Sequence, residues 1–330
     1  MKVTTQFVET NVSWLVDDIE VKATLTVPTG TGPFPAVLMV AGSGPTDRNW
    51  NTPLIPGTNG SAALLARVLN DAGFVTLRYD KRVSGQQANE NLSRMMGKIS
   101  KQGHVDELAG GMQLLIGHET VDSRYIFALT NSEGCLHAMN YQLQPGITPF
   151  SGLLLTSAPA RPVGEVAHSQ LAAQLAAVPG GDQMLASYDH AINDFVAGKP
   201  VIIDESLPEG IRNLLLSITN PLNQPFSSEL WMMDVSKLIK DIRQPVLVLL
   251  GKKDIQVVWQ IDGPIFEEMA AKQANIKLEY ADNANHVLKN EPRTLAEMTI
   301  TEIMESYNPE AGRLDDQAVD VITSWLKSQR

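Results

Sequence analysis

Short apolar runs recur along this chain, and several are separated by stretches with the apolar spacing of helices. Such runs are typical of buried parallel strands, because both faces of a parallel sheet are covered. They occur at residues 35–40, 74–79, 125–131, 152–156, 247–251 and 276–280. Helical spacing occurs at residues 61–72, just before Gly73, and at residues 105–116. The alternation predicts an α/β fold with a mostly parallel, doubly wound sheet.

The beginning and the middle of the chain depart from this pattern. Apolar residues at 12–16 and 21–27 flank an Asp-Asp pair, which predicts an antiparallel hairpin at the sheet edge. Residues 161–235 are rich in Ala, Leu and Gln and are interrupted by prolines, which predicts several helices. We therefore expect a core formed by residues 1–160 and 236–330, with residues 161–235 inserted as a helical cap.

A serine follows the run at residues 125–131, where a helix is expected to begin. Ser132 starts a Ser-Glu-Gly segment, and a sharp strand-to-helix turn of this kind holds the nucleophilic serine of many hydrolases. The helix N-terminus would supply unpaired N–H groups and a positive dipole end, which stabilise an oxyanion. The segment departs from Gly-x-Ser-x-Gly at Thr130, and Asn131 takes a position often held by His. On its own, the serine is also compatible with a simple helix N-cap.

Two later strands lead to the residues that such a nucleophile needs. The run at 247–251 is followed by Asp254, and the alternating run at 276–280 is followed by His286. Ligand-binding residues of parallel sheets gather at the carboxyl ends of the strands, so Ser132, Asp254 and His286 are expected to lie together. A serine hydroxyl needs a base such as His, and a carboxylate can hold the imidazole in the required tautomer. The chain order Ser, Asp, His is that of the α/β-hydrolases.

A glycine-rich loop follows the strand predicted at residues 35–40. Residues 41–45 read Ala-Gly-Ser-Gly-Pro, and glycines let the backbone approach a substrate closely. We expect the backbone N–H of Ser43 to be one oxyanion donor, the N–H of Glu133 to be the other, and Gly42 to lie against the substrate. A segment of this composition is also typical of an ordinary turn, which is the alternative for the loop taken alone.

Other residues compete for these roles. Asp282 is near His286 but on the same loop, so Asp254 is preferred as the acid. Cys135 follows the strand-to-helix turn at Ser132, called the elbow below, and is expected to be a small core residue rather than a nucleophile. The other histidines follow no late strand and have no metal-ligand spacing, so structural or solvent-facing positions are expected for His104, His118, His137, His168 and His190. The glycine-rich loop at residues 41–45 is called the oxyanion loop. We expect ion pairs that brace this loop, and not substrate contacts, from Asp47, Arg48, Asp80 and Arg82.

Five segments carry a family resemblance when they are taken in order. They are Gly42-Ser-Gly-Pro-Thr-Asp-Arg48, Leu77-Arg-Tyr-Asp-Lys-Arg82, Asn131-Ser-Glu-Gly134, Gly251-Lys-Lys-Asp254 and Asn285-His286. This set resembles a bacterial α/β-hydrolase family of esterases and of lysophospholipase-like and serine-aminopeptidase-like hydrolases. The resemblance implies an eight-stranded core with an inserted cap, no cofactor, and hydrolysis of acyl esters. The chain departs from the family pattern at Thr130, Asn131, Cys135 and Val83.

Composition and charge limit the class of protein. With 43% hydrophobic and 19% charged residues, the 330-residue chain can bury a large core. The formal net charge of −11 argues against nucleic acid or an anionic membrane surface as a partner. There is neither a cationic leader with an apolar stretch nor an apolar run of the roughly 18 residues that a membrane span requires. We therefore expect a cytoplasmic protein, and the family resemblance together with the lack of metal-ligand spacing implies neither cofactor nor metal. The sequence leaves the oligomeric state open, a homodimer included.

These features predict a serine hydrolase that cleaves carboxylic acid esters with short to medium acyl chains through an acyl-enzyme. Apolar cap residues are expected either to line the acyl pocket or to pack the cap onto the core, and those chosen as substrate contacts are Leu230, Trp231 and Met232. Two alternatives stay open. An aminopeptidase or amidase could use the same triad, and a non-catalytic binding protein could share the fold. The amidase would bind an ammonium group through acidic cap residues, namely Asp182, Asp189, Asp194, Asp204 and Glu205.

Overall fold

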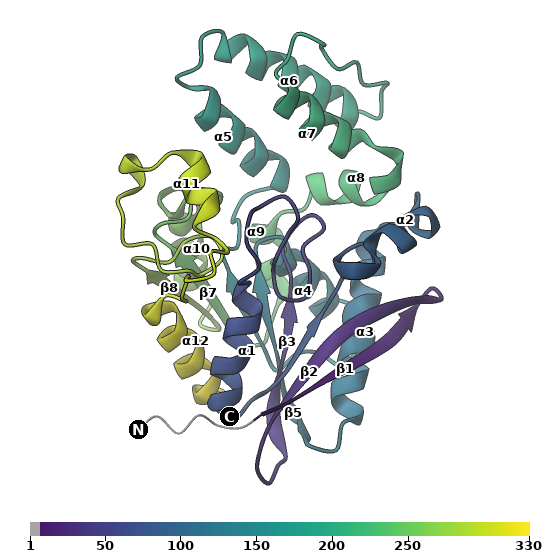
Figure 1. The fold of residues 1–330 in the computed structure, drawn as a ribbon, viewed down its shortest axis with the longest axis vertical. Coiled ribbons are helices and arrows are strands. Elements are labelled where there is room, and N and C mark those ends of the chain that lie inside the picture. Colours follow the sequence, from purple (N-terminus) through teal and green to yellow (C-terminus); the bar gives the residue numbers. More distant parts are fainter. Residues whose placement is uncertain (1–6) are drawn as a thin grey trace.

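An eight-stranded sheet forms the centre of the protein, whose computed structural model describes residues 7–330 (Figure 1). The strands lie in the order β1-β2-β4-β3-β5-β6-β7-β8. The β1–β2 and β2–β4 pairs are antiparallel and all other pairs are parallel, so the predicted α/β fold with a mostly parallel sheet is confirmed. The strands are β1 Phe7–Val16, β2 Ile19–Pro28, β3 Phe34–Val40, β4 Val75–Tyr79, β5 Val121–Asn131, β6 Gly152–Thr156, β7 Val246–Gly251 and β8 Ile276–Ala281.

The predicted N-terminal hairpin is present and lies at the sheet edge. Its strands β1 and β2 are longer than the apolar pattern indicates, and they pair from Val16 with Ile19 outwards. Asp17 and Asp18 form the two-residue turn with φ values of 50° and 60°. Two left-handed residues are what a type I′ turn requires, and Asp tolerates that conformation better than most residues.

Helices cover both faces of the sheet, as a doubly wound fold requires. Alternate residues of β3 enter two separate apolar clusters, with Leu38 in one and Val37 in the other. The first cluster includes α3 (Lys101–Gly117), α4 (Gly134–Gln142), α9 (Val235–Leu238) and α10 (Trp259–Lys272), and the second includes α1 (Ser61–Asp71) and α12 (Asp316–Ser328). The remaining core helices are α2 (Ala88–Met95) and α11 (Ile300–Glu305), with single 3₁₀ turns at Gly85–Gln87, Ile239–Asp241 and Leu295–Glu297. The central strands are therefore apolar on both sides, which explains their continuous hydrophobic runs.

Four further helices form a unit at the carboxyl end of the sheet (Figure 1). They are α5 (Val163–Leu175), α6 (Gly181–Val196), α7 (Glu209–Thr219) and α8 (Phe226–Trp231), with a 3₁₀ turn at Pro221–Asn223. This helical insertion has a small apolar cluster of its own, which includes Leu171, Tyr188 and Leu215. Its two connections to the core lie side by side, because the N–H of Val163 donates to the carbonyl of Met233 at 3.1 Å.

Candidate active site

The chain makes a strained turn at Ser132, between the end of β5 and the start of α4. Ser132 has a φ of 52°, its N–H donates to the carbonyl of Thr156 at 2.9 Å, and its carbonyl accepts from the N–H of Cys135 at 3.0 Å. A side chain at Gly134 would place its Cβ 2.7 Å from the carbonyl oxygens of Val40 and Ala41. The glycine two residues after Ser132 is therefore required, because α4 starts directly against the end of β3.

Both departures from the elbow motif have structural partners. The hydroxyl of Thr130 is buried, donates to the carbonyl of Leu154 at 2.9 Å and lies 3.0 Å from Cys135 Sγ. Asn131 Nδ2 donates to the carbonyl of His286 at 2.9 Å. Thr130 thus joins β5 to β6, while Asn131 joins the elbow to the loop that carries His286.

His286 and Asp254 form a buried pair beyond the ends of β8 and β7. His286 Nδ1 lies 2.8 Å from Asp254 Oδ2, and the two residues are 5% and 3% exposed. Asp254 Oδ1 accepts from the N–H groups of Gln256 and Val257, so both carboxylate oxygens are engaged. Because Nδ1 faces the carboxylate, Nε2 is the nitrogen left for proton exchange, and it has no hydrogen bond within residues 7–330.

The loop that carries His286 also lies against the elbow. The carbonyl oxygen of His286 accepts from Asn131, directly before Ser132, and from Ser157 Oγ at 2.8 Å. The residues predicted at the ends of β5, β7 and β8 thus share one edge of the sheet. No hydrogen bond joins Ser132 Oγ to His286 in the described structure, and such bonds often form only once substrate is bound.

Two backbone N–H groups beside Ser132 lack an acceptor in the part of the chain that the structure describes. They belong to Ser43, in the loop after β3, and to Glu133, at the start of α4. The loop touches the elbow, because a Cβ at Gly42 would lie 3.2 Å from the carbonyl oxygen of Asn131 and 3.4 Å from Ser132 Cβ. Both N–H groups predicted as oxyanion donors are thus free of protein acceptors among the described residues, and their role towards substrate stays a prediction.

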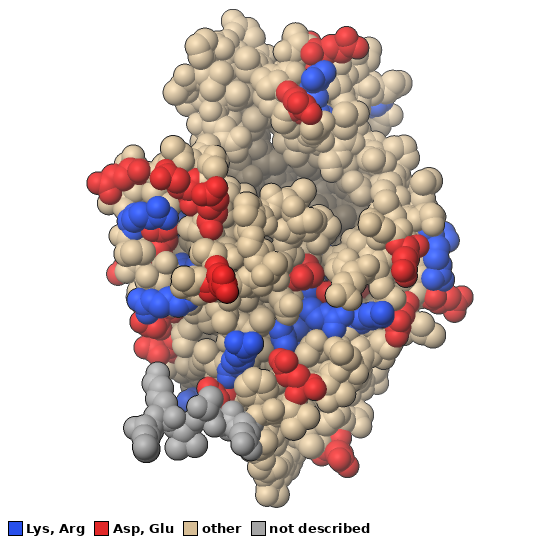
Figure 2. Space-filling model, in the orientation of Figure 1, with Lys and Arg blue, Asp and Glu red and all other residues tan. Residues whose placement is uncertain are grey.

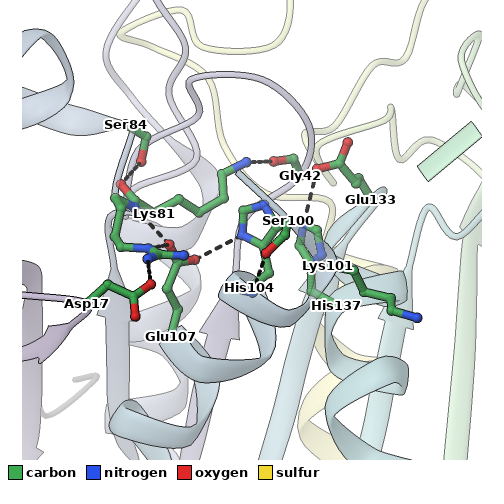
Figure 3. Close-up of polar contacts among 12 residues, drawn as sticks. Asp17, Gly42, Lys81, Ser84, Ser100, Lys101, His104, Glu107, Glu133 and His137 are labelled. Atoms are coloured by element: carbon green, nitrogen blue, oxygen red, sulfur yellow. Dashed lines mark hydrogen bonds and ion pairs between the residues drawn. The ribbon is translucent and has the colours of Figure 1, made fainter. Parts of the chain in front are cut away.

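A buried group of charged and polar side chains extends from this loop into the core (Figure 3). We call it the buried polar cluster, and its members are Lys81, Arg82, His104, Glu107, Glu133 and His137. Glu107 accepts from Arg82 Nε and pairs with His104 Nδ1, both at 3.0 Å. Glu133 Oε1 lies 3.1 Å from His137 Nε2, and the rings of His104 and His137 stack with centroids 4.1 Å apart.

Three members of this cluster, Glu107, Glu133 and His137, have strongly perturbed pKa values. Burial alone raises the pKa of the Glu107 carboxyl, but His104 and Arg82 together outweigh it and hold this pKa at about 2. Burial likewise raises the pKa of Glu133, and the hydrogen bond from His137 with the charge of Lys81 outweighs it, giving about 2. Burial and the neighbouring His104 lower the pKa of His137 to about 4. At neutral pH the cluster therefore holds ionised carboxylates and a neutral His137.

These shifts predict that the protein loses stability as the pH falls. The unfolded state protonates His137 below pH 6.5, whereas the folded state takes up that proton only near pH 4. Glu107 acts in the same direction, because its stabilisation is complete above pH 4.5 and is lost towards pH 2. We expect the urea midpoint to fall steadily between pH 6.5 and 4. In Glu107→Gln the profile should be shallower below pH 4.5, and an unchanged profile would contradict a role for this cluster.

Sequence reasoning overlooked the buried polar cluster. Lys81 lies within the segment quoted for the family resemblance, but its type and spacing gave no sign that it bonds the oxyanion loop. His104 and His137 were expected in structural or solvent-facing positions, and both are buried. Their separation of thirty-three positions is bridged only by the packing of α3 against α4.

The competing residues are engaged elsewhere. Asp282 is exposed and pairs with Lys252 at 2.8 Å. Cys135 is fully buried, and burial raises the pKa of its thiol to about 12, so it is a poor nucleophile. His118 bonds Thr120, His168 pairs with Asp189, and His190 pairs with Asp194.

One ion pair braces the chain just after the oxyanion loop, in part as predicted. Arg48 bonds the carboxylate of Asp80 through its backbone N–H, Nε and Nη2, which confirms a bracing role for this pair. Asp47 instead accepts from two backbone N–H groups of its own loop. Arg82 does not join them, since it pairs with Glu107 in the buried polar cluster and with the exposed Asp17 of the N-terminal hairpin.

The predicted substrate contacts of the helical insertion occupy different environments. Leu230 packs against the main core, and the Trp231 ring meets Phe195 edge-on with centroids 6.4 Å apart. Met232 is 66% exposed. Packing therefore accounts for Leu230 and Trp231 without a ligand, and their role towards substrate, like that of Met232 and Gly42, stays a prediction.

Known proteins resemble this chain in sequence and in structure. No family model matches the chain. Esterase EstD of Thermotoga maritima is 23% identical over an alignment of 313 residues that covers 92% of this chain and 64% of that protein, so the chain spans less than two thirds of this relative. An esterase of Pyrococcus furiosus superposes with a TM-score of 0.56 at 16% identity, covering 98% of this chain and 91% of the other. The acylaminoacyl peptidase of Pyrococcus horikoshii gives 0.54 at 12% identity, covering 99% and 42%.

The chain therefore has the α/β-hydrolase fold, and its resemblance to esterase-like members of that fold is confirmed. Within residues 7–330, no three His, Cys, Asp or Glu side chains are grouped in a way that could hold a metal ion. No helix among the described residues is long and apolar enough to cross a membrane.

Proposed function

We propose that this protein is a serine hydrolase that cleaves carboxylic acid esters. The observation that carries the proposal is the buried His286–Asp254 pair, bonded at 2.8 Å and tied through Asn131 to a strained Ser132. A serine held with a positive φ is costly, and such strain is found at functional sites. A serine hydrolase also needs hydrogen-bond donors for the oxyanion, and the unpaired N–H groups of Ser43 and Glu133 would supply them.

The proposed reaction uses each group once in each half. Ser132 Oγ attacks the ester carbonyl carbon while His286 Nε2 takes the hydroxyl proton, and the carbonyl oxygen becomes an oxyanion that the two N–H groups bind. His286 then protonates the leaving alcohol as the carbon–oxygen bond breaks, which leaves an acyl-serine. Water attacks this ester by the same route and releases the acid. Asp254 holds the His286 Nδ1–H throughout and stabilises the imidazolium.

We also propose that residues 161–235 act as a cap that shapes the acyl site. Figure 2 shows a hollow between the helical insertion and the core, and its visible walls carry mostly uncharged side chains. The start of the helical insertion is fixed to the core, because Arg161 pairs with the buried Asp262 at 3.1 Å. An uncharged hollow favours acyl groups of short to medium length, which bury apolar surface.

Amide or peptide hydrolysis is the second candidate, on the same residues. The structural likeness to an acylaminoacyl peptidase favours it, although the triad chemistry serves both bonds. The acidic cap residues expected to bind a substrate ammonium are partly engaged. Asp189 pairs with His168, Asp194 with His190, and Asp204 accepts from Ser206 and Ser187. These contacts reduce their availability to an ammonium group, so the ester reading is preferred.

Substrate panels separate these functions. We expect turnover of p-nitrophenyl esters from acetate to at least octanoate, with the best chain length reporting the size of the cap hollow. Aminoacyl p-nitroanilides should react much more slowly. A faster reaction with anilides than with esters would contradict the proposed esterase function and favour a peptidase. If neither series reacts and a fluorophosphonate probe does not label the protein, a non-catalytic binding protein becomes the better reading.

A further inference from the structure

One buried ammonium group is bonded to the loop that carries the Ser43 N–H. Lys81 Nζ donates to the carbonyl oxygen of Gly42 at 2.5 Å, and Lys81 is only 3% exposed (Figure 3). This is the sole hydrogen bond of the ammonium group within residues 7–330. Burying an ammonium group is costly unless it is paired or bonded. One hydrogen bond compensates only part of this cost, because burial still lowers the pKa of Lys81. An apolar side chain would avoid the cost, which points to a functional reason for the lysine.

The contact with Gly42 fixes the direction of a second group. The Gly42 carbonyl and the Ser43 N–H belong to one planar peptide, and in a trans peptide these two bonds point in nearly opposite directions. The next carbonyl along, that of Ser43, accepts from the hydroxyl of Thr46 at 2.7 Å. Both peptides at Ser43 are thus held, and the unpaired N–H points away from the ammonium group.

We propose that Lys81 is a positioning residue of the oxyanion hole, which orients the Ser43 N–H through the Gly42 carbonyl without touching substrate. This inference deepens the proposed function and rests on it. The ammonium charge also polarises the Gly42–Ser43 peptide, which makes its N–H a better donor to an oxyanion. Lysine suits the task because its flexible stem carries a compact charge across the distance from β4 to the loop.

The second donor lies in the field of the same ammonium group. Glu133, whose N–H is the other donor, has a buried carboxylate whose charge acts on Lys81. Lys81 and Arg82 balance Glu107 and Glu133, so the buried polar cluster has no net charge when its histidines are neutral. Removing Lys81 therefore does two things, since it frees the Gly42 carbonyl and leaves Glu133 without a counter-charge near the developing oxyanion.

The first test is Lys81→Met, assayed with p-nitrophenyl butyrate. Loss of a complete oxyanion donor costs about 10²–10³-fold in kcat, and a misdirected donor should cost somewhat less, about 10–10²-fold. KM should change by less than about threefold, because ground-state contacts remain. An alkyl trifluoromethyl ketone, which adds to the serine as an anionic hemiketal, should bind more weakly by a factor similar to the loss in kcat/KM. Unchanged kcat and ketone affinity would overturn the inference.

Ser84→Ala is the matched control on the same turn. Ser84 Oγ donates to the Lys81 carbonyl at 3.1 Å, so this variant removes a buried hydrogen bond of Lys81 and leaves the ammonium group in place. We expect a small loss in melting temperature from the missing hydrogen bond, but less than a twofold change in kcat and ketone affinity. If Ser84→Ala lowers kcat as much as Lys81→Met, general weakening of the turn explains both and the inference fails.

A double variant separates orientation from charge. In Lys81→Met/Glu133→Gln the uncompensated carboxylate is gone while the Gly42 carbonyl stays free. Orientation predicts that kcat stays low, whereas full recovery would assign the effect to charge and overturn the positioning role. If Lys81→Met does not fold, Lys81→Leu, which also lacks a hydrogen-bond donor, is measured instead, with the same expected results.

The proposed function can fail in a distinguishable way. If the wild-type protein neither hydrolyses esters nor reacts with a fluorophosphonate at Ser132, the site is not a serine hydrolase and the inference falls with it. If the wild type is active and labelled but Lys81→Met keeps full kcat and ketone affinity, only the inference is wrong.

Discussion

Ser132→Ala is expected to reduce ester hydrolysis by about 10⁴-fold or more. The variant removes the attacking oxygen, so no acyl-enzyme forms, and only binding and the oxyanion donors remain to accelerate attack by water. Measured as kcat for the best p-nitrophenyl ester, the loss should appear with little change in melting temperature, because Ser132 Oγ makes no hydrogen bond within residues 7–330. Reaction with a fluorophosphonate probe should disappear at the same time.

Cys135→Ala is the control for nucleophile identity. Cys135 lies three residues after Ser132, but its thiol is fully buried and its raised pKa, about 12, keeps it protonated at neutral pH. We expect this variant to retain most of the turnover and all of the labelling. If instead Cys135→Ala is inactive while Ser132→Ala retains the wild-type rate, the nucleophile has been assigned to the wrong residue.

The strands could be predicted because sequence pattern and burial agree there. Runs such as 247–251 are apolar on both faces of the sheet, so each is continuous and each ends where a loop begins. Parallel strands then place those loops at one edge, which is why the sequence alone predicts that Asp254 and His286 meet across thirty-two positions. The sharp turn at Ser132 could be predicted because it needs a glycine at position 134, where there is no room for a side chain. That glycine is visible in the sequence.

The remaining features depend on contacts that have no local pattern. Asn131 resembled a defect in the elbow motif, yet its amide reaches the carbonyl of His286. Lys81 meets Gly42 across thirty-nine positions, and a single lysine carries no periodicity that would reveal it. The packing of Trp231 against Phe195 depends on how the helices of the insertion associate, which apolar spacing alone does not determine. Tertiary arrangement decides all three.

Asp254→Asn is expected to lower kcat by about 10³–10⁴-fold while the protein stays folded. The amide oxygen can still accept from the N–H groups of Gln256 and Val257, so the loop after β7 keeps its bonds. The amide nitrogen then faces His286 Nδ1 as a donor, which makes Nδ1 the acceptor and moves the imidazole proton to Nε2. With its proton on Nε2, His286 can no longer take one from Ser132, and the imidazolium also loses its counter-charge.

Asp282→Asn provides the matched comparison, because Asp282 is the other carboxylate near His286 in the sequence. It is exposed and bonded to Lys252, and surface pairs of this kind contribute little to stability. We expect kcat within about twofold of wild type, since the change leaves Asp254 on His286 Nδ1. The ratio of the two losses is the decisive quantity, and a larger loss for Asp282→Asn would transfer the role of acid to that residue. A large loss confined to Asp254→Asn requires the tautomer argument, because only that substitution reverses the hydrogen bond at His286.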